Sequence, residues 1–210
     1  EPRRNPDVNA PWICDTGRWD YHYVYAETKI RTPRGKKNGA YRDQTWNECF
    51  STLKETIAVE PSKVCVALST FMTNEEIADS LETFTTLGVK SFVRIADDAA
   101  VEKRTPVDNI LKHADTTPNA MGFSEVFAKT GQKFLTATDA KAQIKSGAFT
   151  WVFFLGLEGI QMPGLADLLL SVPKETKTVI HASNEAALFE KADWLLPNVT
   201  HYEKSGSYVN

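Results

Sequence analysis

The sequence predicts an α/β protein with Rossmann-like architecture: a mostly parallel sheet, helices on both faces and an irregular N-terminal extension. Three observations lead to this prediction. From residue 45 onward, short apolar segments alternate with amphipathic ones. The apolar segments are hydrophobic throughout, which is typical of strands buried on both faces. Two capping boxes mark helix starts between them, as expected where helices cover a parallel sheet.

Composition limits the class of protein. The chain has 210 residues, of which 42% are hydrophobic and 24% are charged, so it can bury a substantial core. A net charge of −3 gives no electrostatic reason to expect nucleic-acid binding. No apolar run reaches the roughly 20 residues that span a bilayer, so we expect no membrane insertion. Three widely spaced cysteines favour a reducing compartment over a disulfide framework.

The first 44 residues read as an irregular extension. Prolines are scattered through them, and Asn38-Gly39 predicts the turn of a small hairpin. The alternating pattern begins only at residue 45. We therefore expect two parts, an extension over 1–44 and an α/β domain over 45–210.

The first α/β unit follows directly. Thr45 and Glu48 form a capping box that opens a helix, and the apolar run KVCVAL (63–68) predicts a buried strand. We expect one face of this helix to be apolar and turned inward. Its members are Trp46, Phe50, Leu53 and Ile57.

The second unit repeats this arrangement. Thr73 and Glu76 form another capping box, and Gly88 is placed to end the helix. Strand SFVRI (91–95) comes next. The inward residues of this helix are expected to be Ile77, Leu81 and Phe84.

Further elements are predicted beyond an indistinct stretch. Strand 151–157 (WVFFLGL) is the strongest, and Pro163 opens the helical segment GLADLLLSV. The other expected elements are a helix over 139–147, a strand over 178–182, a helix over 184–192 and a strand over 194–196.

The turn GLEGIQMPG (156–164) is the best candidate for a pocket. In parallel sheets, ligands bind at the carboxyl ends of strands, and this is the one glycine-rich turn between a strand and a helix. The candidate cofactor-binding residues are Gly156, Glu158 and Gly159. The alternative is that Gly156, Gly159 and Pro163 only shape the turn, because such turns are common without ligands. The sequence contains neither of the glycine patterns that cradle nucleotide phosphates.

The sequence shows no catalytic set. His181 ends an apolar strand, and we favour a hydrogen-bonded residue of the sheet edge over a catalytic base. His113 lies near Asp115 on an expected solvated helix. Cys49 and Cys65 fall on a helix and a strand, where free cysteines act as small core residues. We therefore do not expect this chain alone to be catalytic.

Two end motifs resemble those of molybdopterin-oxidoreductase-type proteins. NPDVNAPWICDTGRW followed by DYHYVYAETKIRTP is similar to the family segment that carries the last cysteine of an iron–sulfur motif. ADWLLPNVTHYEKSGSYVN is similar to its Ala-Asp-x-x-Leu-Pro … Glu-x-x-Gly-x-x-x-Asn block. The matching residues are Asn9, Cys14, Asp15, Gly17, Arg18 and Pro33 at one end, and Ala192, Asp193, Leu196, Pro197, Glu203, Gly206 and Asn210 at the other.

ADTTPNAMGFSEV resembles a segment typical of one branch of this family. That branch is the large iron–sulfur subunit of NADH:quinone oxidoreductase (respiratory complex I), called the G subunit or chain 3. The resemblance implies that the chain is a fragment of a longer subunit, with three cluster ligands upstream of Glu1. In that parent, Cys14 would be the fourth ligand of a [4Fe-4S] cluster; the alternative is a vestigial buried thiol. No cofactor is expected in the chain itself.

The resemblance therefore implies a degenerate molybdopterin-type scaffold domain in the arm that carries electrons from NADH to quinone. Its partners would be other subunits of the complex, at the cytoplasmic inner face of the cell membrane. Glu158-Gly159 stands where the family has Asn-Pro, which argues against pterin binding. Two alternatives stay open: a fragment of a working, formate-dehydrogenase-like molybdopterin enzyme, and an unrelated Rossmann-like domain that binds a small molecule.

The N-terminal segment is rich in aromatic residues. Such rings bury large areas, so we expect them to pack on the α/β body or on a partner, with some left exposed as an adhesive patch. They are Trp12, Trp19, Tyr21, Tyr23 and Tyr25.

Overall fold

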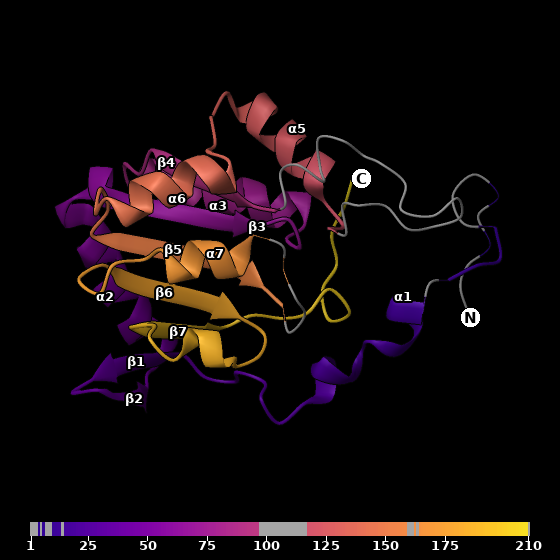
Figure 1. Ribbon diagram of the computed structural model, residues 1–210, viewed down its shortest axis with the longest axis horizontal. Coiled ribbons are helices and arrows are strands. Elements are labelled where there is room, and N and C mark those ends of the chain that lie inside the picture. Colours follow the sequence, from indigo (N-terminus) through magenta and orange to yellow (C-terminus); the bar gives the residue numbers. More distant parts are fainter. Residues whose placement is uncertain are drawn as a thin grey trace.

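The computed structural model describes residues 4, 6, 10–13, 15–96, 117–158, 162 and 164–209. The described chain forms a seven-stranded sheet in the order β2-β1-β7-β6-β5-β3-β4 (Figure 1). Five of these strands run parallel, whereas β1 pairs antiparallel with β2 and β7. The predicted α/β class with a mostly parallel sheet is confirmed. The strands are β1 (Arg34–Lys37), β2 (Ala40–Asp43), β3 (Val64–Ser69), β4 (Ser91–Ile95), β5 (Trp151–Leu157), β6 (Lys177–Ala182) and β7 (Trp194–Pro197).

The order of the parallel strands defines a switch point. The chain starts at β3, adds β4 on one side, and then returns to add β5, β6 and β7 on the other. The direction of winding therefore reverses between β3 and β5. In open α/β sheets, the crevice outside the carboxyl ends of two such strands is the usual ligand position.

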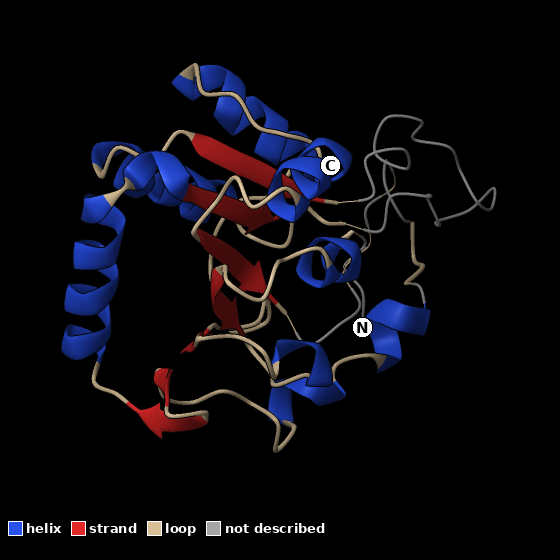
Figure 2. Ribbon diagram, turned by 60° about the vertical axis from the view of Figure 1, so that its left-hand side comes forward, coloured by secondary structure: helices blue, strands red, loops and turns tan. Residues whose placement is uncertain are grey.

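Helices cover both faces of the sheet (Figure 2). Helices α2 (Trp46–Val59), α3 (Asn74–Thr86) and α5 (Ala120–Thr130) lie on one face. Helices α6 (Ala137–Lys145) and α7 (Leu165–Leu170) lie on the other. None of the helices in the described parts of the chain is long and apolar enough to cross a membrane.

Strand β3 shows why its sequence is apolar at every position. Cys65 and Ala67 pack on the α6–α7 side, whereas Val64, Val66 and Leu68 pack on the α2–α3–α5 side. All five side chains are buried. An uninterrupted apolar run is therefore what a central strand between two helical layers requires.

The hairpin predicted at Asn38-Gly39 is confirmed. Both residues have positive φ angles, 53° and 81°, as a type I′ turn requires. Residues 34–35 of this hairpin pair with β7, so it extends the sheet. The division of the chain at residue 44 remains a prediction.

Both capping boxes are present. The Thr45 backbone N–H donates to Glu48 Oε2 at 2.8 Å, and the Glu48 N–H donates to Thr45 Oγ1 at 3.3 Å. Thr73 and Glu76 make the same pair of bonds at the start of α3, at 2.8 and 3.1 Å. At the other end of α3, Gly88 has φ +88° in a left-handed cap, as predicted.

The predicted inner face of α2 is wrong in part. The buried residues are Cys49, Leu53 and Ile57, spaced four apart. Trp46 and Phe50 are exposed, Phe50 by 58%, and their rings stack 5.1 Å apart. Phe50 follows Cys49 directly, which rotates it about 100° away from the buried stripe. The small thiol of Cys49, rather than an aromatic ring, faces the sheet.

The predicted helix over 184–192 is also wrong. Only the 3₁₀ turn η3 (Ala187–Phe189) forms there. Asn184 forms a β-bridge with Lys29, and the Glu185 N–H donates to the Thr28 carbonyl at 2.7 Å. These contacts with the N-terminal segment hold the start of the connection extended, so no α-helix can begin there.

Helix α5 was not predicted from the sequence. Its buried side chains include Phe123 and Phe127, which are four residues apart. A Cβ at Gly122 would lie 2.1 Å from the Oδ1 atoms of Asn119 and Asn74, so close packing accounts for this glycine. The helix expected around His113 lies outside the described residues.

Candidate functional site

The predicted pocket turn leaves β5 at the switch point of the sheet. Gly156 has φ +74°, and the register between β5 and β6 shifts between Phe154 and Leu157. A Cβ at Gly156 would lie 2.1 Å from Met72 Cγ, so both backbone conformation and packing require glycine. Gly159 lies outside the described residues.

His181 accepts a backbone hydrogen bond at the point where the pairing of β5 with β6 is interrupted. The Gly156 N–H donates to His181 Nδ1 at 3.3 Å, which requires that nitrogen to be unprotonated. Burial, reinforced by the positive charge of Lys204, lowers the pKa of His181 to about 4, although Glu76 and the Pro197 carbonyl act in the opposite direction. This geometry supports the interpretation of His181 as a hydrogen-bonded residue near the carboxyl ends of the parallel strands.

Glu158 lies at the centre of a buried polar cluster. Its side chain has no exposed surface. Its Oε2 atom accepts a hydrogen bond from the Tyr23 hydroxyl at 3.3 Å and lies 2.7 Å from His201 Nδ1. Burial and then the charge of Glu158 raise the pKa of Tyr23. The sequence singled out Glu158 as a pocket residue and Tyr23 only as one of the N-terminal aromatic residues. It gave no signal that Tyr23 and His201, from distant segments, would contact Glu158.

Lys204 compensates the negative charge of this cluster. Its Nζ atom lies 2.9 Å from Glu76 Oε2 and 3.7 Å from Glu158 Oε1, and it donates to the Phe71 carbonyl at 3.3 Å. Glu158 Oε1 and the Tyr208 hydroxyl are buried without a hydrogen-bond partner among the described residues. Buried polar atoms of this kind usually bind ordered water.

The N-terminal and C-terminal segments of the described chain lie over the carboxyl ends of the parallel strands. Figure 1 shows the segment with α1 (Asp15–Trp19) and the C-terminal segment at the end to which the parallel strands point. The Ile30 N–H donates to the Ser183 carbonyl at 2.9 Å, and Asn198 Nδ2 donates to the Leu157 carbonyl at 3.1 Å. In the described part of the chain, the two end segments therefore lie over the position where a ligand would bind.

Residues of the C-terminal motif have structural roles here. Asp193 accepts a hydrogen bond from the Thr178 N–H at 2.9 Å, and Glu203 pairs with Lys29. Gly206 packs against the cap of α3, because a Cβ there would lie 2.4 Å from Thr73 Cγ2. Ala192 and Leu196 are buried, and Asn210 lies outside the described residues.

The described residues do not fit an iron–sulfur cluster. Cys14 lies outside them. Cys49 and Cys65 pack on opposite faces of the sheet, and burial raises their pKa values to about 11 and about 12. The described residues contain no group of three potential metal-binding side chains. Neither described thiol is suited to bind metal as a thiolate.

The described part of the edge does not fit a phosphorylated pterin either. The N-terminus of α3 follows β3 and would be the natural phosphate position. Two of its N–H groups are already bound, because Thr73 Oγ1 accepts from the Glu76 N–H and the Ser207 carbonyl accepts from the Asn74 N–H. Lys204, the positive charge at this position, is already paired with the carboxylates of Glu76 and Glu158.

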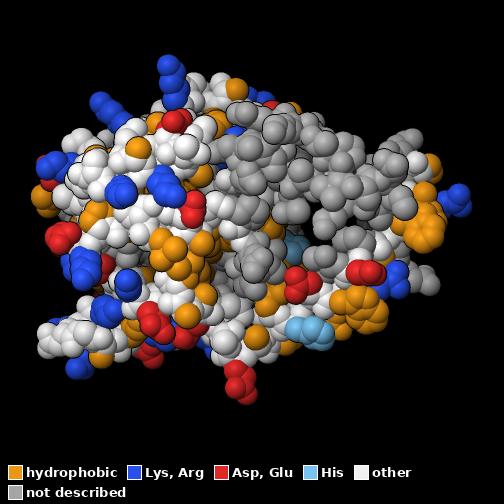
Figure 3. Space-filling view, in the orientation of Figure 1, with side chains coloured by type: hydrophobic (Ala, Val, Ile, Leu, Met, Phe, Trp, Pro, Cys, Tyr) orange, Lys and Arg blue, Asp and Glu red, His pale blue; other side chains and the backbone are white. Residues whose placement is uncertain are grey.

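The N-terminal aromatic residues lie mostly in solvent. Tyr23 is half-buried, but Trp19 and Tyr25 are 62% and 81% exposed, and Trp12 and Tyr21 are also exposed. Figure 3 shows hydrophobic side chains gathered at this end of the molecule. Among the described residues, the rings of Trp19, Tyr21 and Tyr25 therefore expose apolar area to solvent.

Fold and site together define an α/β domain whose carboxyl edge is covered, in its described part, by the two end segments. No protein-family model matches the chain. It is 40% identical over 53 residues to NADH-quinone oxidoreductase subunit 3 of Thermus thermophilus. It is 29% identical over 129 residues to the NADH-ubiquinone oxidoreductase 75 kDa subunit of Reclinomonas americana. It is also 29% identical over 83 residues to the G subunit of the NADH-quinone oxidoreductase of Rickettsia conorii.

These similarities cover parts of the chain and small parts of the relatives. The matches take in 25%, 56% and 39% of this chain, and 7%, 18% and 12% of the respective relatives. They relate the chain to a region of the G or 75 kDa subunit of NADH-quinone oxidoreductases.

Proposed function

We propose that this chain is a scaffold domain of the large iron–sulfur subunit of an NADH:quinone oxidoreductase, derived from a molybdopterin-type domain that no longer binds pterin. The observation that carries the proposal is its similarity to three proteins, all named as subunits of this oxidoreductase. In this role the chain is part of the arm that carries electrons from NADH to quinone, and it performs no chemistry itself.

The closed edge supports the scaffold role. Glu158, Tyr23 and His201 fill the switch point where a working enzyme of this architecture would hold a ligand. The exposed rings of Trp19 and Tyr25 supply apolar area for contacts with neighbouring subunits. The proposed location is the inner face of the membrane, as a peripheral part of the complex. Cys14 would bind a [4Fe-4S] cluster only in a longer parent subunit.

Native electrophoresis tests this proposal. The chromosomal gene is tagged in the cells that make this protein, and solubilised membranes are separated on a native gel. We expect the tag to comigrate with the band that stains for NADH dehydrogenase activity. A tag that migrates apart from this activity would overturn the proposal. Molybdenum in the tagged complex, in near-stoichiometric amount, would instead favour the working molybdopterin enzyme.

A further inference from the structure

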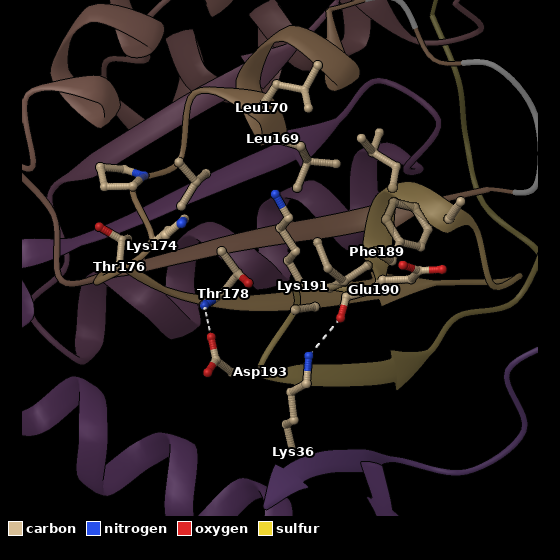
Figure 4. A pocket seen from close by; sticks show the side chains of 16 residues that line it. Lys36, Leu169, Leu170, Lys174, Thr176, Thr178, Phe189, Glu190, Lys191 and Asp193 are labelled. Carbon is tan, nitrogen blue, oxygen red and sulfur yellow. Dashed lines mark hydrogen bonds between the residues drawn. The ribbon is translucent and has the colours of Figure 1, made fainter. Parts of the chain in front are cut away.

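A lysine of the C-terminal segment is held at the switch point of the sheet. The Lys204 side chain is only 7% exposed, and its Nζ atom donates to Glu76 Oε2 at 2.9 Å and to the Phe71 carbonyl at 3.3 Å. Lys36 also donates to a carbonyl, that of Glu190 at 2.7 Å, but it lies exposed in the groove beside α7 (Figure 4). Burial of an ammonium group is costly unless acceptors surround it, so the protein must supply such acceptors around Lys204.

The acceptors around the Lys204 ammonium group all belong to the α/β body. Phe71 lies in the turn after β3, Glu76 in the first turn of α3, and Glu158 directly after β5. Glu158 Oε1 lies 3.7 Å from Lys204 Nζ. It has no hydrogen-bond partner among the described residues, although its side chain is fully buried. The position therefore offers three oxygen atoms to a primary ammonium group, which has three N–H donors and no acceptor.

The C-terminal segment is also attached by bonds that do not involve Lys204. The Ser207 carbonyl accepts from the Asn74 N–H at 2.9 Å, and the Val209 carbonyl accepts from the Gly122 N–H at 3.0 Å. These bonds join the segment to the starts of α3 and α5, and Figure 1 shows it running toward α5. Removal of the lysine side chain alone would therefore leave a space lined by acceptors rather than release the segment.

We propose that the switch point is a binding site for a primary ammonium group, and that Lys204 fills it as a ligand tethered to the C-terminal segment. Glu76, Glu158 and the Phe71 carbonyl recognise the group by its charge and its N–H donors. The free ligands of this class are primary alkylammonium ions, which Lys204 excludes from the intact chain. The proposal goes beyond the scaffold function and does not depend on it, because the acceptors and the occupant are all residues of this chain.

Chemical rescue of a truncated lysine tests the proposal. In the full chain, Lys204→Ala leaves Glu76 and Glu158 without the ammonium group, so the unfolded fraction at a fixed urea concentration should rise roughly tenfold or more. The n-propylammonium ion has the atoms that this substitution removes. At about 50 mM it should restore at least half of the lost urea midpoint, whereas equal concentrations of tetramethylammonium, which lacks N–H donors, or of potassium should restore none. If Lys204→Ala does not fold alone, the same ions are compared for the yield of folded chain on refolding.

Lys204→Met is the matched control, because its unbranched side chain fills the same space without an ammonium group. The n-propylammonium ion should change the urea midpoints of this variant and of the parent no more than tetramethylammonium does. Equal rescue of the alanine and methionine variants would overturn the proposal. So would equal rescue of Lys204→Ala by n-propylammonium and potassium, or no rescue by either ion.

Chemical modification of the parent chain supplies an independent measurement. Lysines are reductively methylated in the folded protein, and the rate at each position is followed by mass spectrometry. Lys204 should react at least about tenfold more slowly than Lys129, whose side chain is 79% exposed. Equal rates would show that the ammonium group is not held in the site and would overturn the proposal. None of these measurements requires the respiratory complex, so their failure would leave the scaffold function untouched.

Discussion

Replacement of His181 tests whether its unprotonated ring stabilises the fold by accepting the hydrogen bond of the Gly156 N–H. The folded protein holds the pKa of His181 at about 4, mainly through burial, whereas the ordinary value is 6.5. Between these two values the unfolded chain binds more protons than the folded one. The free energy of unfolding therefore rises with pH and falls as the solution is acidified through this window. At 1.36 kcal/mol per pH unit, the full window corresponds to about 3 kcal/mol, of which about 2 kcal/mol is lost between pH 7 and pH 5.

Two substitutions separate the charge effect from the hydrogen bond. His181→Asn keeps an acceptor for the Gly156 N–H but cannot titrate, so we expect it to lose about 2 kcal/mol less than the parent between pH 7 and pH 5. His181→Leu leaves that N–H without a partner and should lower the free energy of unfolding by about 1–3 kcal/mol at pH 7. Urea unfolding followed by circular dichroism measures both effects. His22→Asn is the control, because His22 is exposed.

One result would refute this reasoning. If His181→Asn and the parent lose the same free energy of unfolding between pH 7 and pH 5, then the pKa of His181 is not lowered in the folded protein. Equal stability of His181→Leu and the parent at pH 7 would show that the hydrogen bond from Gly156 contributes nothing to folding.

Three further variants test how the end segments pack on the sheet and whether the exposed aromatic residues cause association. Gly206→Ala places a methyl group against Thr73, which caps α3, so it should lower the free energy of unfolding in urea by about 1–3 kcal/mol. The control Ser205→Ala, at the neighbouring position, should lower it far less. Equal losses in the two variants would contradict the packing argument. Asn184→Ala removes two hydrogen bonds to the N-terminal segment and should speed its proteolytic cleavage, whereas an unchanged rate would show that other contacts hold it. Trp19→Ser combined with Tyr25→Ser should reduce self-association in sedimentation velocity, and undiminished association would place the adhesive surface elsewhere.

Local signals account for the elements that could be predicted. The capping boxes at Thr45 and Thr73 and the turn at Asn38-Gly39 depend on side chains within a few residues, so their physical causes are visible in the sequence. Buried strands such as β3 are apolar throughout because helices cover both faces. These short-range patterns were sufficient to predict the fold class.

Contacts between distant segments account for what could not be predicted. NEAALFEKA has helix-forming composition, but Lys29 and Thr28 hold its first residues extended. The candidate site could be predicted only in part, for the same reason. Glu158 stands out in its turn, yet Tyr23 and His201 reach it from positions 135 and 43 residues away. Such partners become visible only once the sheet brings the two end segments together.

Electron microscopy of the tagged complex tests the central claim most directly. The complex is purified from the cells that make this chain, and its map is determined at a resolution that shows side chains. The scaffold account predicts that the chain lies in the arm outside the membrane, with Tyr23 and His201 against Glu158 and no pterin at the switch point. A pterin bound there, with the contact between Tyr23 and Glu158 broken, would contradict the account, as would a complete NADH:quinone oxidoreductase that lacks this chain.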